Sequence, residues 1–227
     1  MRMMTAAVAL ATAFALSVPA HAEDGASGDK GKWQIKLLGS AVLADGKLTD
    51  KTKDLVGLPG NLETKANDNY VPTIAVEYFF TNNISVETIC CVTQHDVDGT
   101  VGLPGAELVA DAKIIPATLT LKYHVDAGPI KPYVGVGPTY FIFIDEKPGA
   151  AAKTLGADGF KLNDKFGVAL QAGVDVPLGD NGLSLALDAK KYFLNTSAHW
   201  YVGQTEVIAT RHALDPWVLS AGLGFRF

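Results

Sequence analysis

The chain has 227 residues and a formal net charge of −5, and 48% of its residues are hydrophobic. The negative charge gives no support to nucleic-acid binding. The two cysteines, Cys90 and Cys91, are neighbours and provide no disulfide framework. No stretch after Ala22 offers the ~18 consecutive apolar residues of a transmembrane helix. We therefore expect this chain to enter a membrane only as a closed barrel of strands.

The first 22 residues have the pattern of a secretory signal. Arg2 precedes an apolar run over residues 3–18, and Ala20-His21-Ala22 supplies a small-residue cleavage site. A retained membrane anchor is the alternative, but the polar stretch 23–32 argues against it. We expect residues 1–22 to be a cleaved signal peptide and residues 23–227 to form a single domain.

Apolar and polar residues alternate in eight stretches of the mature chain, which is the period of a strand with two different faces. The predicted strands cover residues 32–42, 70–80, 84–93, 113–125, 130–144, 162–176, 183–193 and 213–227. Short turns alternate with four long connections, at residues 44–69, 94–112, 145–161 and 195–212.

The last stretch shows the alternation most clearly. One face carries large apolar residues and the other carries small or charged ones. The apolar face comprises Trp217, Leu219, Ala221, Leu223, Phe225 and Phe227. Such a strand suits a barrel wall with lipid outside. A soluble barrel shows the same alternation with its faces exchanged, so this strand alone does not decide between them.

The predicted fold is all-β, an eight-stranded antiparallel up-and-down transmembrane β-barrel. Strands of about 11 residues, rising about 3.3 Å per residue, are long enough to cross a bilayer core at the tilt that barrels adopt. Short turns at one rim and long loops at the other are typical of outer-membrane barrels. A secreted lipocalin-like barrel, the alternative fold, gives no reason for that asymmetry. We therefore expect a location in the bacterial outer membrane.

Six stretches of this chain also carry a resemblance. They are residues 33–35 (WQI), 82–87 (NNISVE), 116–124 (PATLTLKYH), 131–137 (KPYVGVG), 171–175 (QAGVD) and 215–227 (DPWVLSAGLGFRF). In this order they resemble the OmpW family of small outer-membrane β-barrels. The resemblance implies a narrow, apolar-lined channel for small hydrophobic molecules. The partners we expect are outer-membrane lipid, small hydrophobic solutes, and the barrel-insertion machinery acting through the C-terminal strand.

Threading the strands alternately up and down places charged residues inside the barrel near the short turns. These are Glu77, Glu87, Lys122, Asp175 and Arg226, with Lys36 and Gln171 above them. Eight strands enclose a space that side chains nearly fill. Charges in so dry a space must pair, so we expect an ionic floor across the barrel. A purely structural network that fills the interior is the alternative, and the two are compatible.

The upper part of the interior is predicted to be apolar, with Leu38, Ile89, Phe141 and Phe143 facing inward. An apolar funnel above a charged floor suits a hydrophobic solute that enters from outside. Because the solute would not cross the floor easily, we expect lateral release into the bilayer. Three prolines, Pro116, Pro138 and Pro216, each remove a backbone hydrogen bond from the wall. A strand end or bulge is the alternative interpretation, and we favour it for Pro216.

Aromatic residues near the strand ends are predicted to form membrane-interface belts. The belt near the short turns comprises Trp33, Tyr78, Phe80, Phe225 and Phe227, and the other comprises Tyr140, Phe166, Phe193 and Trp217. Ordinary strand aromatics are the alternative, but clustering at two heights favours belts.

Two other functions remain open from the sequence. A lipid-modifying enzyme is one, since His95, Asp96, Ser197 and His199 lie in or beside long connections. They share no motif with fixed geometric roles, and a metal site at residues 95–98 has weaker support still. We expect solvated loop residues there, with no catalytic residue, metal or cofactor. A structural or stress-protective barrel without transport is the other alternative.

Overall fold

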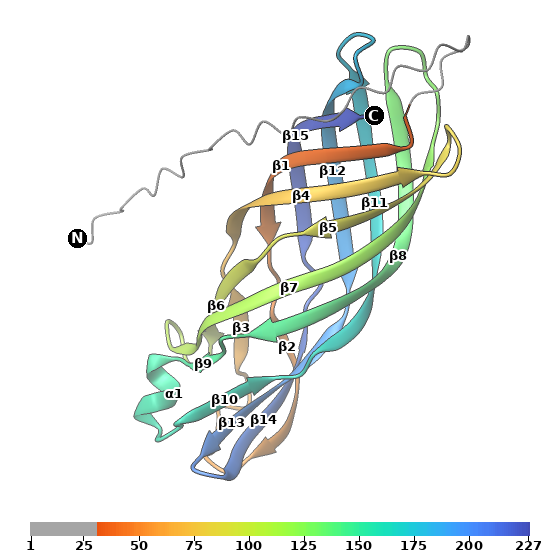
Figure 1. Ribbon diagram of the computed structural model, residues 1–227. Coiled ribbons are helices and arrows are strands. Elements are labelled where there is room, and N and C mark those ends of the chain that lie inside the picture. Colours follow the sequence, from red (N-terminus) through yellow and green to blue (C-terminus); the bar gives the residue numbers. More distant parts are fainter. Residues whose placement is uncertain (1–30) are drawn as a thin grey trace, which may run out of the picture.

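The computed structural model describes residues 31–227, so the predicted signal peptide lies outside the described residues. Most of this part of the chain is strand (Figure 1). The elements in chain order are β1 (Trp33–Leu43), β2 (Lys47–Asp54), β3 (Glu63–Ala66), β4 (Asn69–Phe79), β5 (Ile84–Cys90), β6 (Thr93–Val101), β7 (Glu107–His124), β8 (Lys131–Ile144), β9 (Lys147–Pro148), α1 (Ala150–Thr154), β10 (Gly159–Leu162), β11 (Lys165–Pro177), β12 (Leu183–Phe193), β13 (Asn195–Val202), β14 (Thr205–Ala213) and β15 (Trp217–Arg226). In residues 31–227, no helix is long and apolar enough to span a membrane.

Eight antiparallel strands close into a barrel, which confirms the predicted fold. The ring runs β1, β4, β5, β7, β8, β11, β12 and β15, and β15 pairs with β1 to close it. The structure differs from the predicted bounds by a few residues at most strand ends. The larger differences are in β7, which begins at Glu107, and in β15, which begins at Trp217.

Side chains alternate between the barrel interior and its outer surface along each strand. In β1, Gln34, Lys36 and Leu38 are buried inside, whereas Leu37 is 62% exposed outside. The predicted phase of this strand is therefore correct. Cys90 and Cys91 follow the same alternation as free thiols, one exposed and one buried.

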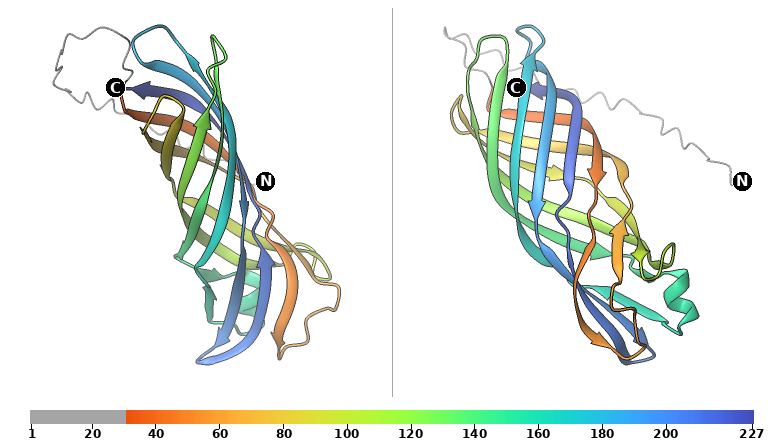
Figure 2. Two further views of the ribbon diagram at one scale, coloured as in Figure 1. Left: turned by 90° about the vertical axis from the view of Figure 1, so that its right-hand side faces the viewer. Right: turned by 180° about the vertical axis from the view of Figure 1, so that it is seen from behind.

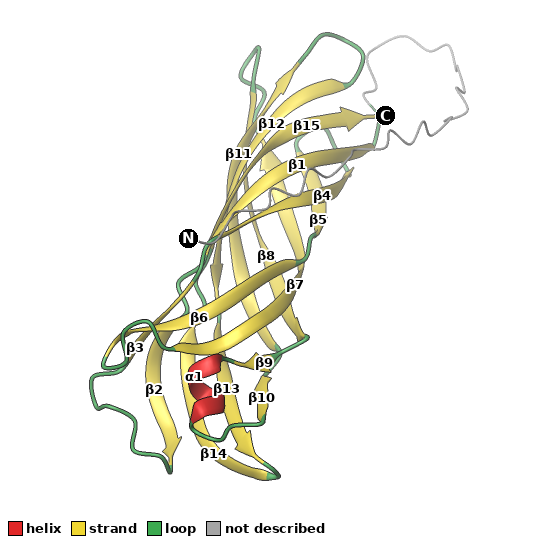
Figure 3. Cartoon of the chain, turned by 90° about the vertical axis from the view of Figure 1, so that its left-hand side faces the viewer, coloured by secondary structure: helices red, strands yellow, loops and turns green. Residues whose placement is uncertain are grey.

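The long connections were predicted as loops, and that prediction is wrong for much of their length. β10, β13, β14 and β2 form a second sheet in that order. Their order matches that of β11, β12, β15 and β1, so each strand of the second sheet continues a barrel strand. On the other wall, β3 and β6 extend the barrel beside β7. Figures 2 and 3 show this continuation of the cylinder, with α1 at the same end.

The barrel strands and their continuations are separated by breaks that follow one another around the wall. The breaks fall at residues 44–46, 67–68, 91–92, 145–146, 163–164, 194 and 214–216, while β7 passes through. Carboxylates replace missing backbone partners there. Asp164 accepts the N–H of Phe143 at 2.9 Å, and Asp215 accepts that of Leu194 at 3.1 Å. We call the part beyond these breaks the outer extension.

The predicted belt residues lie on the outer surface in contacting groups. Trp33 packs edge-on against Tyr78 with ring centroids 4.8 Å apart, and Tyr140 lies 4.5 Å from Phe166. Phe80, Phe193, Trp217, Phe225 and Phe227 are each between 44% and 57% exposed. Their depth in the bilayer stays a prediction.

Candidate functional site

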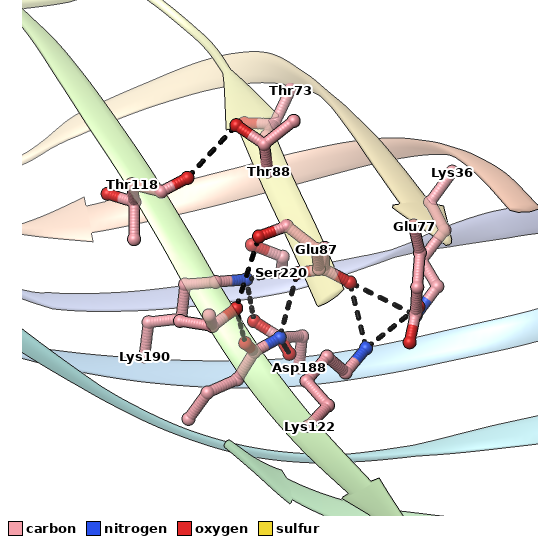
Figure 4. A network of polar contacts seen from close by, with 12 residues as sticks. Lys36, Thr73, Glu77, Glu87, Thr88, Thr118, Lys122, Asp188, Lys190 and Ser220 are labelled. Carbon is pink, nitrogen blue, oxygen red and sulfur yellow. Dashed lines mark hydrogen bonds and ion pairs between the residues drawn. The ribbon is translucent and has the colours of Figure 1, made fainter. Parts of the chain in front are cut away.

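Charged side chains meet inside the barrel, as Figure 4 shows. Glu87 is central, with its carboxylate 2.8 Å from the ammonium of Lys122, 3.0 Å from that of Lys190 and 3.4 Å from that of Lys36. Glu77 contacts Lys122 at 2.9 Å and Lys36 at 3.0 Å. All five side chains are at most 3% exposed. These charges stabilise one another where water is scarce.

Further polar groups extend this arrangement. Asp188 pairs with Lys190 at 2.8 Å and accepts the hydroxyl of Tyr133 at 2.8 Å. The Gln171 amide donates to Glu87 at 2.9 Å and to Asp188 at 2.6 Å. We use the term ion cluster for Lys36, Glu77, Glu87, Lys122, Asp175, Asp188 and Lys190.

The ion cluster contains four of the five residues predicted for the floor, namely Glu77, Glu87, Lys122 and Asp175. The fifth, Arg226, lies elsewhere. Its guanidinium is 3.6 Å from the ring centroid of Phe79, and it donates to the backbone oxygen of Gly31 at 2.6 Å. Because Arg226 is the last residue of β15, its long side chain reaches the rim of the barrel.

Two members of the ion cluster were missing from the predicted floor. Asp188 and Lys190 lie on the inward face of β12, at 7% and 2% exposure. Their positions within β12 alone do not give their height along the barrel axis. Barrel strands tilt, so residues at different strand positions meet at one height.

Hydroxyl groups adjoin the ion cluster on two walls. The Ser40 hydroxyl lies 2.7 Å from those of Thr73 and Ser220, and Ser220 faces Asp188 across neighbouring strands. On the opposite side, the hydroxyl of Thr118 lies 2.8 Å from that of Thr139. It also donates to the Tyr192 hydroxyl oxygen at 3.5 Å.

A cavity of about 110 Å³ lies next to these hydroxyls. The four predicted apolar residues, Leu38, Ile89, Phe141 and Phe143, all lie on its wall. The wall continues into the outer extension, where Trp200 belongs to it. It draws on all three buried apolar clusters of the described residues. The polar groups nearest the ion cluster on this wall are those of Thr73, Lys190, Tyr192 and Ser220.

Two buried histidines also line the cavity, each in a Thr-x-His pattern. Nε2 of His95 is 2.8 Å from the Thr93 hydroxyl, and Nε2 of His212 is 2.7 Å from the Thr210 hydroxyl. Burial lowers the pKa of His95, and it lowers the pKa of His212 to about 4. The expectation of a solvated loop residue is therefore wrong for His95, which is only 4% exposed.

The residues considered for catalysis do not come together. His95 is on β6, where its Nδ1 donates to the backbone oxygen of Asn67 at 2.7 Å and its Nε2 contacts the Thr93 hydroxyl. His199 is on β13, in the other sheet, and contacts Glu206 at 3.3 Å. Across residues 31–227, no three His, Cys, Asp or Glu side chains are grouped so that they could hold a metal ion.

Comparisons with known proteins agree with this architecture. The OmpW family model matches residues 29–227. The chain is 33% identical to the uncharacterized outer-membrane protein y4mB of Sinorhizobium fredii, over 92% of this chain and 85% of that protein. It is 31% identical to the dibenzothiophene metabolism operon protein PahQ of Pseudomonas aeruginosa, over 75% of this chain and 77% of that protein.

Two solved structures have the same fold. The crystal structure of the outer membrane protein OprG from Pseudomonas aeruginosa has a TM-score of 0.69 at 27% identity, covering 88% of this chain and 98% of that one. The solid-state NMR structure of the outer membrane protein AlkL in lipid bilayers has a TM-score of 0.71 at 27% identity, covering 92% and 95%. The chain therefore belongs to the OmpW family and is an outer-membrane β-barrel.

Proposed function

We propose that this barrel takes up small hydrophobic molecules through its apolar cavity and releases them sideways into the bilayer. The observation that carries the proposal is an apolar cavity that ends at a buried ion cluster. Outer-membrane barrels place long loops outside the cell and short turns in the periplasm. The cavity then faces the exterior, and the ion cluster lies on its periplasmic side.

The wall of the cavity favours apolar solutes because such molecules leave water when they enter it. The ion cluster opposes their further passage. An apolar molecule that moved past Glu87 would have to separate it from Lys122 and Lys190, and an unpaired buried charge is costly. A solute in the cavity therefore meets a barrier towards the periplasm.

The name of one relative supports this class of solute. PahQ is a protein of a dibenzothiophene metabolism operon. Dibenzothiophene is a fused aromatic thioether with no ionisable group, so its chemistry suits an apolar wall rather than a charged one.

Interruptions in the wall support lateral release. The pairing of β7 with β8 runs to Thr118 and Thr139 and resumes at Leu121 and Val136, so two pairs are missing from the ladder at residues 137–138. Pro138 has no N–H to donate. Pro116 lines the cavity and lies on β7 opposite the break between β5 and β6. The wall therefore lacks backbone hydrogen bonds at Pro138 and, beside the cavity, at Pro116.

Uptake by cells tests the proposal. Cells that produce Ala112→Phe should take up dibenzothiophene more slowly than cells with the unchanged barrel, because Ala112 is 3% exposed and lines the cavity. The matched control is Ala117→Phe, on the outer surface of the same strand, which should leave uptake unchanged. Folded barrel is quantified by its heat-modifiable gel mobility. Normal uptake through a folded Ala112→Phe barrel would refute the proposal.

A further inference from the structure

The end of the cavity nearest the ion cluster offers more hydrogen-bond donors than the protein uses. Tyr192 is 1% exposed, and its oxygen accepts from Thr118 at the long distance of 3.5 Å. Within residues 31–227, its own hydroxyl hydrogen has no acceptor. Tyr192 lines the cavity, and its ring is fixed against Phe141 with centroids 5.4 Å apart.

A chain of three hydroxyls provides a second donor. Ser40 lies between Thr73 and Ser220, at 2.7 Å from each. Three hydroxyls carry three hydrogens, but the chain contains only two hydrogen bonds. If the two bonds run in the same direction, an end hydroxyl keeps a hydrogen to donate, and if both ends donate to Ser40, the Ser40 hydroxyl keeps it. Both end residues, Thr73 and Ser220, line the cavity.

Lys190 provides a third donor at the same end. Its ammonium bonds Glu87 at 3.0 Å and Asp188 at 2.8 Å, and an ammonium has three hydrogens. Lys190 also lines the cavity. The end wall therefore suits a ligand that accepts hydrogen bonds, since a buried donor without an acceptor is unfavourable.

The charge balance decides which acceptor fits. The three ammonium groups of the ion cluster, on Lys36, Lys122 and Lys190, contact four carboxylates. Two further titratable groups contact the cluster, His124 at 2.8 Å from Glu77 and Tyr133, whose hydroxyl donates to Asp188. Even a protonated His124 would only balance the charges. No positive charge is spare for a carboxylate ligand, whose burial requires one.

We propose that, among small hydrophobic molecules, the cavity binds most tightly those that are neutral and carry one carbonyl oxygen, such as ketones and esters. The apolar body lies along the wall formed by Phe141 and its neighbours, and the oxygen accepts from Tyr192 and the adjacent donors. Hydrocarbons leave these donors unpaired, and carboxylates add a negative charge beside Glu87 and Asp188. This inference rests on the proposed function and refines its class of solute.

Binding of three matched probes in lipid nanodiscs tests the inference. The probes are octane, hexyl methyl ketone and octanoate, which share their number of carbons. Binding is followed by the fluorescence of Trp200, which lines the cavity, with Trp33 and Trp217 replaced by Phe. Comparing variants with the same probe cancels its partitioning into lipid.

Tyr192→Phe should weaken binding of the ketone about fivefold, the value of one neutral hydrogen bond, and leave octane unchanged. Thr73→Val is a second variant, which removes a donor from the opposite wall and should act in the same direction. The control is Tyr123→Phe, since Tyr123 is 55% exposed on the outer surface and should affect no probe.

Unchanged ketone binding in both cavity variants, or tighter binding of octanoate than of the ketone, would overturn the inference. In either case octane would still bind, and the proposed uptake function would stand. If none of the three probes bound the unchanged barrel, the proposed function would fail together with the inference.

Discussion

His212 shows how burial in the outer extension determines the charge of a single side chain. Its ring contacts the Thr210 hydroxyl at 2.7 Å and the backbone oxygen of Gly46 at 3.4 Å. Burial lowers its pKa to about 4, against about 6.5 in an unfolded chain. His212 therefore stays neutral at neutral pH and contributes to an uncharged cavity wall.

Acid should weaken the outer extension through this residue. Between about pH 6.5 and about pH 4, His212 is protonated in the unfolded state but not in the folded state. The free energy of unfolding of the outer extension therefore falls as the pH falls through this window. The loss is on the order of 3 kcal/mol once the pH is below the folded pKa. Protection of β2 and β14 amides from hydrogen exchange measures it.

The change His212→Gln should make that protection less dependent on pH. The matched control is His199→Gln, because His199 is a partly exposed histidine in the same sheet. It should retain the dependence of the unchanged chain. An equal loss of protection with and without His212 would show that its burial is not the cause.

At the scale of elements, the sequence predicted the strands whose two faces meet different surroundings. β1 and β15 alternate strictly because one face meets the interior and the other meets lipid. β2 has no such alternation, since its own sequence, KLTDKTKD, is almost entirely polar. It is a strand because it continues β1 and pairs with β14. Pairing of this kind depends on tertiary context, which local sequence does not contain.

The candidate site was predictable to a similar extent. Alternation placed Glu77 and Phe141 inside the barrel. Assigning Lys190 to the ion cluster required the tilt of the strands, and excluding Arg226 required the position of the rim. Neither quantity can be read from a single strand.

The outward phase of β12 can be tested by a charge on its lipid face. Leu185→Arg should destabilise the barrel by about 2–4 kcal/mol if residue 185 lies near mid-depth, and less towards an interface. The reason is the cost of placing an arginine in hydrocarbon. Unfolding by urea in lipid vesicles measures the change in free energy.

Val202→Arg is the matched control. Val202 is 41% exposed, close to the 39% of Leu185, but it lies at the end of β13 in the outer extension. Its substitution should leave the free energy of unfolding nearly unchanged. Equal stability of the two variants would mean that Leu185 does not face lipid.

Over the whole molecule, the outer surface and the interior differ in how polar and apolar side chains are distributed. The outer surface of the barrel is apolar at many heights, as at Leu37, Val134 and Leu223, each at least 50% exposed. The interior changes from charged to apolar along the barrel axis. A lipid-facing wall with this interior suits a passage that begins outside the cell and ends within the membrane.

A lipid-modifying enzyme would act differently on its surroundings. The purified barrel in liposomes should leave every lipid chemically unchanged, because His95 and His199 lie in separate sheets. Mass spectrometry of the lipids after incubation gives the result. Deacylated or acyl-transferred lipid that disappeared in His95→Ala or His199→Ala would contradict the channel proposal.

The central claim is that the apolar cavity carries the solute and the ion cluster closes the direct path. Glu87→Ala tests both parts, because it leaves Lys122 and Lys190 without their shared partner. Losing one partner of a buried pair costs about 3–5 kcal/mol unless water enters, and here we expect water to enter. Glu63→Ala, an exposed site on β3, is the control.

The decisive measurement compares two fluxes for Glu87→Ala, single-channel ion conductance in planar bilayers and dibenzothiophene uptake by cells. We expect conductance to rise above that of the unchanged barrel and of Glu63→Ala, while solute uptake stays the same because the solute leaves sideways. Solute uptake that rose in step with conductance would show passage straight through the ion cluster and would contradict the account.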